Sequence, residues 1–298
     1  MNHDLKKTGA RSIILGKNHY EGFINFKENK LLKLTKTCIL HDEFKYLDEI
    51  RKIKNYSNYY TIPDKTVKLL EPSDKFFNHV MDLVKDDDMN IFNGPIMYMY
   101  IDDAGDRDLL ETITDIIDSN NFSVWTSLKV IHNFTNKMLE ALNFLHQKKL
   151  CHLDIKPENI MINTLKKTYK IIDFGFCSKE PFNEFILEMK GTPGYFPKYF
   201  PNEKETEWLP IIRANDFIPL NGEIPIKTNR KLVYKIDSFC LGRVLYFLKY
   251  IYQENVIYFC FNNERGTSRN LDEIISSLVE NNIFKRLTIE QCLNKYFK

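Results

Sequence analysis

Two short motifs that lie close together constrain this chain more than any other feature. Residues 152–159 have the sequence His-Leu-Asp-Ile-Lys-Pro-Glu-Asn, and residues 173–175 have the sequence Asp-Phe-Gly. Two short apolar runs with a polar turn between them separate the motifs, which predicts a β-hairpin. Such a hairpin delivers Asp173 beside Asn159. The pattern therefore predicts one site that gathers acidic, basic and amide groups around a space of the size of a phosphate.

These residue types suit the transfer of a phosphoryl group. That reaction asks a protein to orient a hydroxyl, to hold a divalent cation and to spread the developing charge. In this hypothesis Asp154 accepts the proton of the hydroxyl and Lys156 neutralises the moving phosphate. Asn159 and Asp173 hold Mg²⁺, because carboxylate and amide oxygens are ligands that suit this hard cation.

Together with Gly-Thr-Pro-Gly-Tyr at residues 191–195, the two motifs resemble those of eukaryotic-type serine/threonine protein kinases. The resemblance implies an α+β, bilobal fold. Residues 1–101 would form an N-terminal lobe with an antiparallel sheet and one main helix, and residues 102–298 a mainly helical C-terminal lobe. The implied activity is transfer of the γ-phosphoryl group of ATP, with Mg²⁺, to Ser or Thr hydroxyls of proteins.

Lys156 narrows the resemblance within the family. It distinguishes serine/threonine kinases from tyrosine kinases, and its Lys-Pro-Glu-Asn run is absent from the similar loop of small-molecule kinases. Among family members, compact viral kinases are the most similar. This similarity implies a location in the host cytoplasm and packaging in the virion.

The N-terminal part predicts a small sheet. Residues 11–36 alternate short apolar runs with turn residues, which predicts a three-stranded antiparallel meander. In the resemblance the first turn covers the phosphates, yet Gly16 and Gly22 are the only glycines near it, and their spacing departs from Gly-x-Gly-x-x-Gly. Lys33 would contact the α- and β-phosphates, and the alternation favours it over Lys36.

The next elements complete the implied nucleotide site. Residues 40–53 carry apolar side chains at helical spacing, and Glu43 on this helix is expected to pair with Lys33, with Glu49 as the alternative. Residues 95–101 predict a buried strand that leads into a hinge. The backbone groups of Met99 and Ile101 are expected there to bind adenine.

Two stretches exceed what the family needs. Residues 55–93 are expected to elaborate the N-terminal lobe, and residues 200–232, rich in proline, are expected to form an irregular insertion. Neither stretch indicates a role. The segment 173–199 corresponds to the activation segment, in which Thr192 is expected to contact Asp154 and Lys156, while Ser178 is a second hydroxyl open to modification.

The C-terminal part predicts helices. Residues 123–146 have a core-facing stripe at steps of three and four residues, formed by Leu128, Ile131, Phe134, Met138, Leu142 and Leu145. Residues 238–258 are the most apolar long stretch, but charges interrupt it, which indicates a buried helix rather than a membrane span. Asp237 is expected to fix the catalytic loop, and two closing helices are expected at residues 272–279 and 288–297, the second with a capping box at Thr288.

Two departures from the family pattern bear on regulation and stability. Leu153 stands where the family has an Arg that binds a phosphate of the activation segment, which predicts activity without phosphorylation of that segment. The Glu that ordinarily pairs with Arg286 is missing from Phe-Pro-Lys at residues 196–198. We expect either another acid, such as Glu203, or a different set of partners for this Arg, because a buried unpaired charge is costly. His146 and His152 are expected to be structural hydrogen-bonding residues.

Composition limits the partners. The chain has 298 residues, 43% of them hydrophobic, and a net charge of +2, so nothing demands a nucleic-acid or membrane partner. The six cysteines are scattered without a Cys-x-x-Cys pair, which indicates reduced thiols in the cytosol and no zinc site or disulfide framework. Acidic residues dominate residues 86–118, either as a solvated face or as a rim that favours basic acceptors. The oligomeric state stays open.

A second function is a catalytically weak or inactive kinase fold that binds partners. The unusual glycine spacing and the missing Glu favour it. The presence of every group that touches the reacting phosphate favours an active enzyme.

Overall fold

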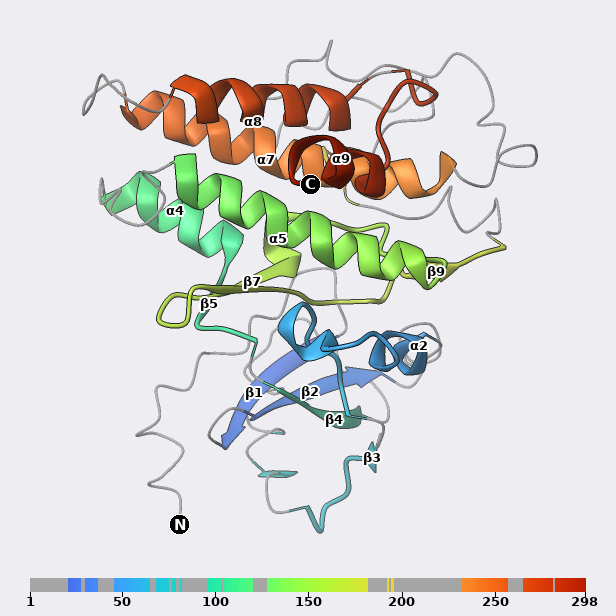
Figure 1. Ribbon diagram of the computed structural model, residues 1–298. Coiled ribbons are helices and arrows are strands. Elements are labelled where there is room, and N and C mark those ends of the chain that lie inside the picture. Colours follow the sequence, from blue (N-terminus) through green and yellow to red (C-terminus); the bar gives the residue numbers. More distant parts are fainter. Residues whose placement is uncertain are drawn as a thin grey trace, which may run out of the picture. The chain divides into compact units, whose positions relative to one another are not determined.

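The computed structural model describes residues 21–27, 30–36, 46–64, 68–74, 77–78, 81, 96–102, 104–119, 128–181, 192, 194–195, 232–256, 265–280 and 282–298. The chain divides into two compact units. Met1–Leu47 and Thr61–Ala104 form the first, here called the sheet unit, and Asp48–Tyr60 and Gly105–Lys298 form the second, the helical unit. Figure 1 labels the elements of both.

The sheet unit contains a four-stranded antiparallel sheet with the order β1-β2-β4-β3. The strands are β1 (Glu21–Lys27), β2 (Lys30–Lys36), β3 (Lys68–Leu69) and β4 (Ile96–Asp102). The pairing places Lys33 opposite Phe23 on one side and Met99 on the other. These strands confirm two strands of the expected meander and the expected strand at residues 95–101, while the expected first strand lies outside the described residues.

Helix α2 (Leu47–Arg51) begins in the sheet unit and continues into the helical unit. Leu47, Ile50 and Ile53 are all buried, as the helical spacing predicts. A short 3-10 turn, η1 (Tyr56–Asn58), follows. The earlier part of the predicted helix, with Glu43, lies outside the described residues.

Two tyrosines explain why the segment after α2 belongs to the helical unit. The carbonyl oxygen of Tyr59 accepts a hydrogen bond from the N–H of Ile171 at 2.8 Å. The hydroxyl of the fully buried Tyr60 donates to the carbonyl oxygen of Ala141. The ring of Tyr60 also lies edge to face against that of Phe174, with centroids 5.9 Å apart. Backbone and aromatic contacts therefore join residues 59–60 to the elements that carry the two motifs.

The helical unit has four long helices and two small sheets among its described residues. Its helices are α4 (Leu109–Ser119), α5 (Leu128–Gln147), α7 (Tyr234–Val256), α8 (Arg265–Leu278) and the shorter α9 (Ile289–Tyr296). Its strands are β5 (Arg107–Asp108), β6 (Leu150–Cys151), β7 (Ile160–Asn163), β8 (Thr168–Ile171) and β9 (Ser178–Lys179). The sheets have the orders β5-β7-β8 and β6-β9.

The core of the helical unit lies around α5. This helix packs against α7, α8 and α9 (Figure 1). Its predicted apolar stripe is confirmed, since all six side chains are at most 2% exposed. Helices α7 and α8 approach closely at Gly242, where an added Cβ would lie 2.7 Å from a side-chain carbon of Val279.

Other helical predictions are also confirmed. Helix α7 is buried through most of its described side chains. In the part of the chain that the structure describes, no helix combines the length and apolar character that crossing a membrane requires. Helix α9 has the expected capping box, in which Thr288 and Gln291 satisfy each other's backbone N–H groups.

Some predictions are not covered, and one helix was missed. Residues 201–231, most of the expected insertion, lie outside the described residues. Helix α4 was not predicted, although Asp108 and Glu111 form a reciprocal cap at its start. That Asp-x-x-Glu pattern before an apolar run was the available signal.

Candidate active site

The first turn of α7 fixes the backbone of residues 152–153. The N–H groups of His152 and Leu153 donate to the two carboxylate oxygens of Asp237 at 2.9 and 2.8 Å. Leu153 has a φ of 66° and a side chain that is fully buried. A left-handed backbone is strained for a non-glycine residue, so these two hydrogen bonds help to hold it. The prediction that Asp237 fixes the loop at residues 152–159 is confirmed.

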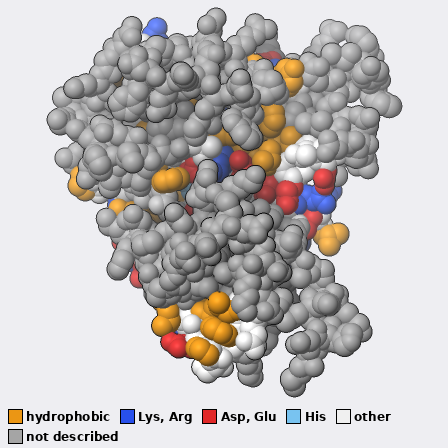
Figure 2. All heavy atoms as spheres, turned by 180° about the vertical axis from the view of Figure 1, so that it is seen from behind, with side chains coloured by type: hydrophobic (Ala, Val, Ile, Leu, Met, Phe, Trp, Pro, Cys, Tyr) orange, Lys and Arg blue, Asp and Glu red, His pale blue; other side chains and the backbone are white. Residues whose placement is uncertain are grey.

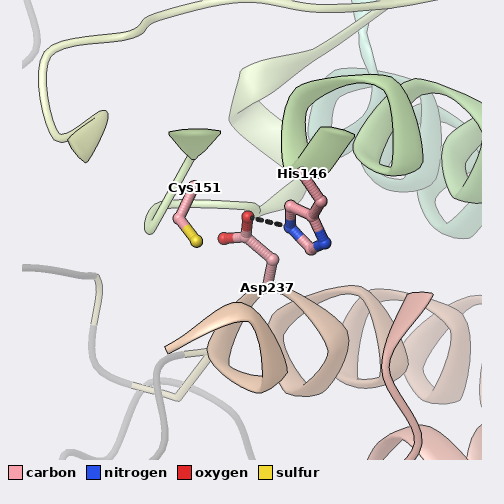
Figure 3. A group of neighbouring side chains, drawn as sticks. All are labelled: His146, Cys151 and Asp237. Carbon is pink, nitrogen blue, oxygen red and sulfur yellow. Dashed lines mark hydrogen bonds and ion pairs between the residues drawn. The ribbon is translucent and has the colours of Figure 1, made fainter. Parts of the chain in front are cut away.

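Asp237 also meets His146 of α5 and the thiol of Cys151 of β6, as Figure 3 shows. The distance from Nε2 of His146 to Oδ2 of Asp237 is 2.9 Å. Burial would raise the pKa of Asp237, but the hydrogen bond and charge of His146, with the N–H of Leu153, hold this pKa below its ordinary value. Both histidines of this region have the structural role that the sequence predicts.

The same three side chains have ligand atoms within 4.8 Å of one another. Such a group could in principle hold a metal ion. The carboxylate of Asp237, however, already accepts hydrogen bonds from two backbone N–H groups and from His146. Burial raises the pKa of the Cys151 thiol well above its ordinary value, which keeps it protonated. We therefore interpret this group as the support of the loop.

Asp154, Lys156 and Thr192 form a compact hydrogen-bonded group. The hydroxyl of Thr192 donates to Oδ1 of Asp154 at 2.6 Å and accepts from Nζ of Lys156 at 2.9 Å. Nζ of Lys156 also lies 3.1 Å from Oδ2 of Asp154. Asp154 is 3% exposed and Lys156 is 8% exposed. The expected contacts of Thr192 are confirmed, and a carboxylate that accepts from a hydroxyl lies beside a fixed positive charge.

Asn159 belongs to the same group. Its amide nitrogen donates to the backbone oxygen of Asp154 at 2.9 Å and to Oδ2 of Asp154 at 3.0 Å. These two bonds occupy the nitrogen of the amide and orient its oxygen away from Asp154. Asn159 ends the 3-10 turn η2 (Pro157–Asn159), which Pro157 begins with its fixed φ.

The hairpin of β7 and β8 delivers Asp173 to this region, as predicted. The N–H of Ile172 donates to the carbonyl oxygen of Asn159 at 3.0 Å, and Nε2 of His152 lies 3.1 Å from the carbonyl oxygen of Ile172. Asp173 itself has a φ of 60°, and its Oδ1 accepts from the N–H of Gly175 at 3.1 Å. The residue before Asp173 is therefore bonded to both ends of the first motif.

A cluster of aromatic rings in edge-to-face contact supports the second motif. Phe174 is fully buried, and its ring lies 5.1 Å from that of His152 and 5.9 Å from that of Tyr60. Edge-to-face contacts of this kind contribute about 0.5–1.5 kcal/mol beyond burial. The cluster fixes the backbone of residue 174 and so limits the positions open to its neighbour Asp173.

The donor set fits a magnesium ion. Asn159 offers an amide oxygen whose nitrogen is already occupied, and Asp173 offers a carboxylate. Both are hard oxygen donors, which Mg²⁺ prefers, and the described residues of this group include no thiolate or imidazole ligand. These are the two residues that would hold the cation.

The sequence-predicted nucleotide residues lie in the sheet unit or outside the described residues. Lys33 is 2% exposed, whereas the side chain of Lys36 is not among those described. Gly22 lies within β1, opposite Leu34. Met99 and Ile101 are buried in β4, while Gly16 and Glu43 fall outside the described residues.

Glu49 has partners of its own in the helical unit. Its Oε1 lies 3.1 Å from Nζ of Lys179 and 3.3 Å from Nζ of Lys52. The pKa of Glu49 is lowered, chiefly by the hydrogen bond from Lys179 and next by that from Lys52. Glu49, the alternative partner suggested for Lys33, thus contacts Lys179 of β9, a contact that no sequence pattern indicated.

Arg286 has several partners. Its Nε donates to the carbonyl oxygen of Glu280 at 2.9 Å, and its Nη1 donates to that of Lys235 at 3.1 Å. Its guanidinium carbon also lies 4.6 Å from the ring centroid of Phe239. Backbone oxygens and an aromatic face thus surround this 3% exposed side chain. Glu203, the acid suggested from the sequence, lies outside the described residues.

Ser178, which the sequence suggested as a modification site, is buried. It lies in β9, pairs with Cys151 and is 6% exposed. The hydroxyl of Thr192 is likewise occupied by Asp154 and Lys156. Ser178 is buried, whereas Thr192 is half-buried.

Comparisons with known proteins agree with the motifs. Residues 91–206 match the family model described as "Protein kinase domain". The phosphorylase b kinase gamma catalytic chain, liver/testis isoform, of Rattus norvegicus is 32% identical over 118 residues, which cover 39% of this chain and 26% of that protein. The serine/threonine-protein kinase ULK3 of Rattus norvegicus is 39% identical over 69 residues, 22% of this chain and 14% of that protein.

A third relative is the serine/threonine-protein kinase nekl-2 of Caenorhabditis elegans, 38% identical over 80 residues, which cover 27% of this chain and 22% of that protein. The similarity thus spans about a quarter or less of the length of these relatives. Residues 91–206, which match the family model, include both motifs and the strands between them. Their antiparallel sheets and packed helices have the α+β fold of a protein kinase domain.

Proposed function

We propose that this chain is a protein kinase that transfers the γ-phosphoryl group of ATP to Ser or Thr hydroxyls of proteins. The observation that carries the proposal is the group formed by Asp154, Lys156, Asn159 and Thr192. In it a buried carboxylate accepts a hydroxyl hydrogen bond at 2.6 Å, with an ammonium group and an amide in contact.

The proposed reaction follows from this arrangement. The hydroxyl of a Ser or Thr acceptor donates to Asp154, as the hydroxyl of Thr192 does, and gives up its proton to that carboxylate. The acceptor oxygen forms a bond to the γ-phosphorus, the bond from the γ-phosphorus to the β,γ-bridging oxygen breaks, and ADP leaves. Lys156 offsets the charge on the moving group. When bound at Asn159 and Asp173, Mg²⁺ supplies positive charge to the phosphate oxygens.

Specificity for Ser and Thr is part of the proposal. Lys156 supports it, because the resemblance links this residue to serine/threonine kinases. Two relatives, ULK3 and nekl-2, are named serine/threonine-protein kinases. Lys33, Met99 and Ile101 are proposed to contact ATP, on the basis of the resemblance alone.

We also propose that activity does not need phosphorylation of the activation segment. Leu153 supports this, because an apolar side chain that is fully buried offers no charge to a phosphate. The expected result is an active protein in which mass spectrometry finds Ser178 and Thr192 unmodified. Activity that appears only after one of them is phosphorylated would contradict it.

A preference for basic acceptors is also part of the proposal. Its support is the acid-rich stretch 86–118, which includes Asp108 at the start of α4. Burial first, and then the charges of Glu111 and Glu158, raise the pKa of Asp108 to about 6. Other acids there have local roles: Asp106 accepts from Thr164, and Asp115 pairs with Arg107. On the face drawn in Figure 2, described acidic and basic side chains lie next to one another.

The location is proposed from chemistry and resemblance. Cys151, Cys177, Cys240 and Cys292 are buried and lie outside any disulfide, which suits a reducing compartment such as the cytosol. The resemblance to compact viral kinases, that of African swine fever virus above all, is the support for a viral origin and the host cytoplasm.

One assay tests the central proposal. Purified protein is incubated with labelled ATP, Mg²⁺ and a basic protein acceptor, beside the Asp154→Asn variant and a sample with excess EDTA. We expect label on Ser or Thr, a fall of about 10²–10⁴-fold in the variant, and no transfer without the cation. Binding of a partner with no transfer by the unmodified protein would favour the inactive binding protein instead.

A further inference from the structure

We propose that Glu49 of α2 is a positioning residue, which holds the segment after Asp173 in place through its ion pair with Lys179 of β9. The inference rests on the proposed function and deepens it. In the family that the sequence resembles, an Arg at the position of Leu153 binds a phosphate on this segment and holds it. In this chain the ion pair of two side chains would hold the segment instead.

The contact itself links two parts of the helical unit that are far apart in sequence. Oε1 of Glu49 lies 3.1 Å from Nζ of Lys179. The side chains are 30% and 35% exposed, so the pair is partly shielded from solvent. Lys52, the second cation near Glu49, lies on the same stretch of chain, at 3.3 Å, and makes only a local pair.

Lys179 lies on the strand that joins the segment after Asp173 to β6. Strand β9 pairs with β6 through Leu150 opposite Lys179 and Cys151 opposite Ser178, and the catalytic loop begins directly after β6. The N–H of Glu180 then donates to the carbonyl oxygen of Lys149 at 2.9 Å. This ladder is only two residues long on each strand, so a further contact at Lys179 adds substantially to what fixes it.

Glu49 lies on a firmly placed element. Its neighbour Ile50 is fully buried, and the segment that follows is held by Tyr59 and Tyr60 to the strands and helix around the site. An ion pair from such a support can hold β9. A pair between two loosely placed side chains would mostly lose its gain to entropy.

The size of the effect is bounded. Exposed ion pairs are weak, and we expect Glu49→Gln to lower kcat by about 2- to 5-fold. Glu49→Lys, which places three lysines together, should lower kcat further. Since the change acts on the segment rather than on stability, the melting temperature should move by no more than about 1–2 °C.

The experiment compares kcat for Glu49→Gln, Lys179→Gln and the double variant. The kcat of the double variant should be no lower than that of either single variant, because the two residues act as a pair. Lys52→Gln is the matched control: it removes the local pair of Glu49 but keeps Lys179, and its kcat should equal that of the unmodified protein. In the Lys52→Gln background, the exchanged pair Glu49→Lys with Lys179→Glu should restore most of the lost kcat.

Salt gives a second readout. The ratio of kcat between the unmodified protein and Glu49→Gln should approach one as ionic strength rises to about 1 M, where the screening length is about 3 Å. If Glu49→Gln lowered kcat by a structural change that does not involve the ion pair, this ratio would stay the same at high ionic strength. Equal kcat for Glu49→Gln and the unmodified protein at low salt overturns the inference, as does an exchanged pair that restores nothing. If the unmodified protein transfers no phosphoryl group, the proposed function fails instead.

Discussion

The hydroxyl of Thr192 closes the hydrogen-bonded group around Asp154, and its removal is the sharpest test at the residue scale. Thr192→Val keeps the shape but removes both the donor to Asp154 and the acceptor for Lys156. We expect kcat to fall by about 5- to 100-fold, because two hydrogen bonds with charged groups are lost, with little change in the free energy of unfolding. Steady-state assays and urea unfolding measure the two quantities.

Thr192→Ser is the control for that prediction. Serine keeps the hydroxyl and should retain most of the activity. A valine variant as active as the serine variant would show that the contacts of residue 192 do not position Asp154.

The residues of the site were predictable where chemistry fixes their spacing. Asp154, Lys156 and Asn159 lie on one short loop, so their grouping was visible in the sequence. In the proposed function they have to meet one phosphate, which explains the fixed spacing. The partners of Arg286 are different, because two of them are backbone carbonyl oxygens, which every residue carries. No sequence pattern could indicate which carbonyls a distant turn would place there.

At the scale of elements, the start of α4 combines a helix cap with a perturbed carboxylate. Burial comes first among the causes that raise the pKa of Asp108 to about 6, and the charges of Glu111 and Glu158 add to it, while the N–H of Glu111 acts the other way. A carboxyl whose pKa is higher in the folded state than the unfolded value of about 3.9 stabilises the fold below that value. The stabilisation is lost as the pH rises through about 6.

Asp108→Asn should therefore stabilise the protein at neutral and higher pH. Asparagine caps a helix as well as aspartate does, and it removes the charge that burial and the two glutamates disfavour. We expect the variant to gain about 1–2 kcal/mol in free energy of unfolding at pH 8 and nothing at pH 4. Urea unfolding across that range checks it, and a variant less stable at pH 8 than the unmodified protein would contradict it.

The segment from α2 to Tyr60 has a packing role that the sequence revealed only in part. The burial of Leu47, Ile50 and Ile53 was predictable from helical spacing. The hydrogen bond from Tyr60 to Ala141 was not, because it joins positions that only the tertiary fold brings together. Helix α5, by contrast, shows its packing in the sequence, since its long stripe has one period throughout.

Tyr60→Phe should lower the free energy of unfolding by about 0.5–1.5 kcal/mol, because it removes one buried hydrogen bond and keeps the ring against Phe174. Tyr60→Ala should cost about 3–5 kcal/mol through the cavity it leaves. Tyr59→Phe is the matched control, since its hydroxyl makes only a partly buried contact with Glu140 at 3.3 Å. A loss for Tyr59→Phe as large as for Tyr60→Phe would contradict this assignment.

At the scale of the whole molecule, the division into two units departs from a single cut along the chain. Asp48–Tyr60 belong to the helical unit although Thr61–Ala104 belong to the sheet unit. The sequence indicated a sheet part and a helical part. The periodicity of α2, however, does not show whether the C-terminal end of this helix packs with the sheet or with the helices. That choice depends on the contacts of Tyr59 and Tyr60 with β8 and α5.

Binding of Mg²⁺ with ATP provides a prediction for the intact chain. A ligand that binds only the folded state stabilises it, by about 2.7 kcal/mol at 100 times its Kd, which raises the melting temperature by several degrees. We expect this rise with ATP and Mg²⁺, a smaller one with ATP and EDTA, and in Asp173→Asn no difference between the two. The reasoning is that Asp173, placed by the hairpin and by the cluster of Phe174 with His152 and Tyr60, is the proposed cation ligand. An equal rise with and without Mg²⁺ in the unmodified protein would show that the oxygens of Asn159 and Asp173 do not hold the cation.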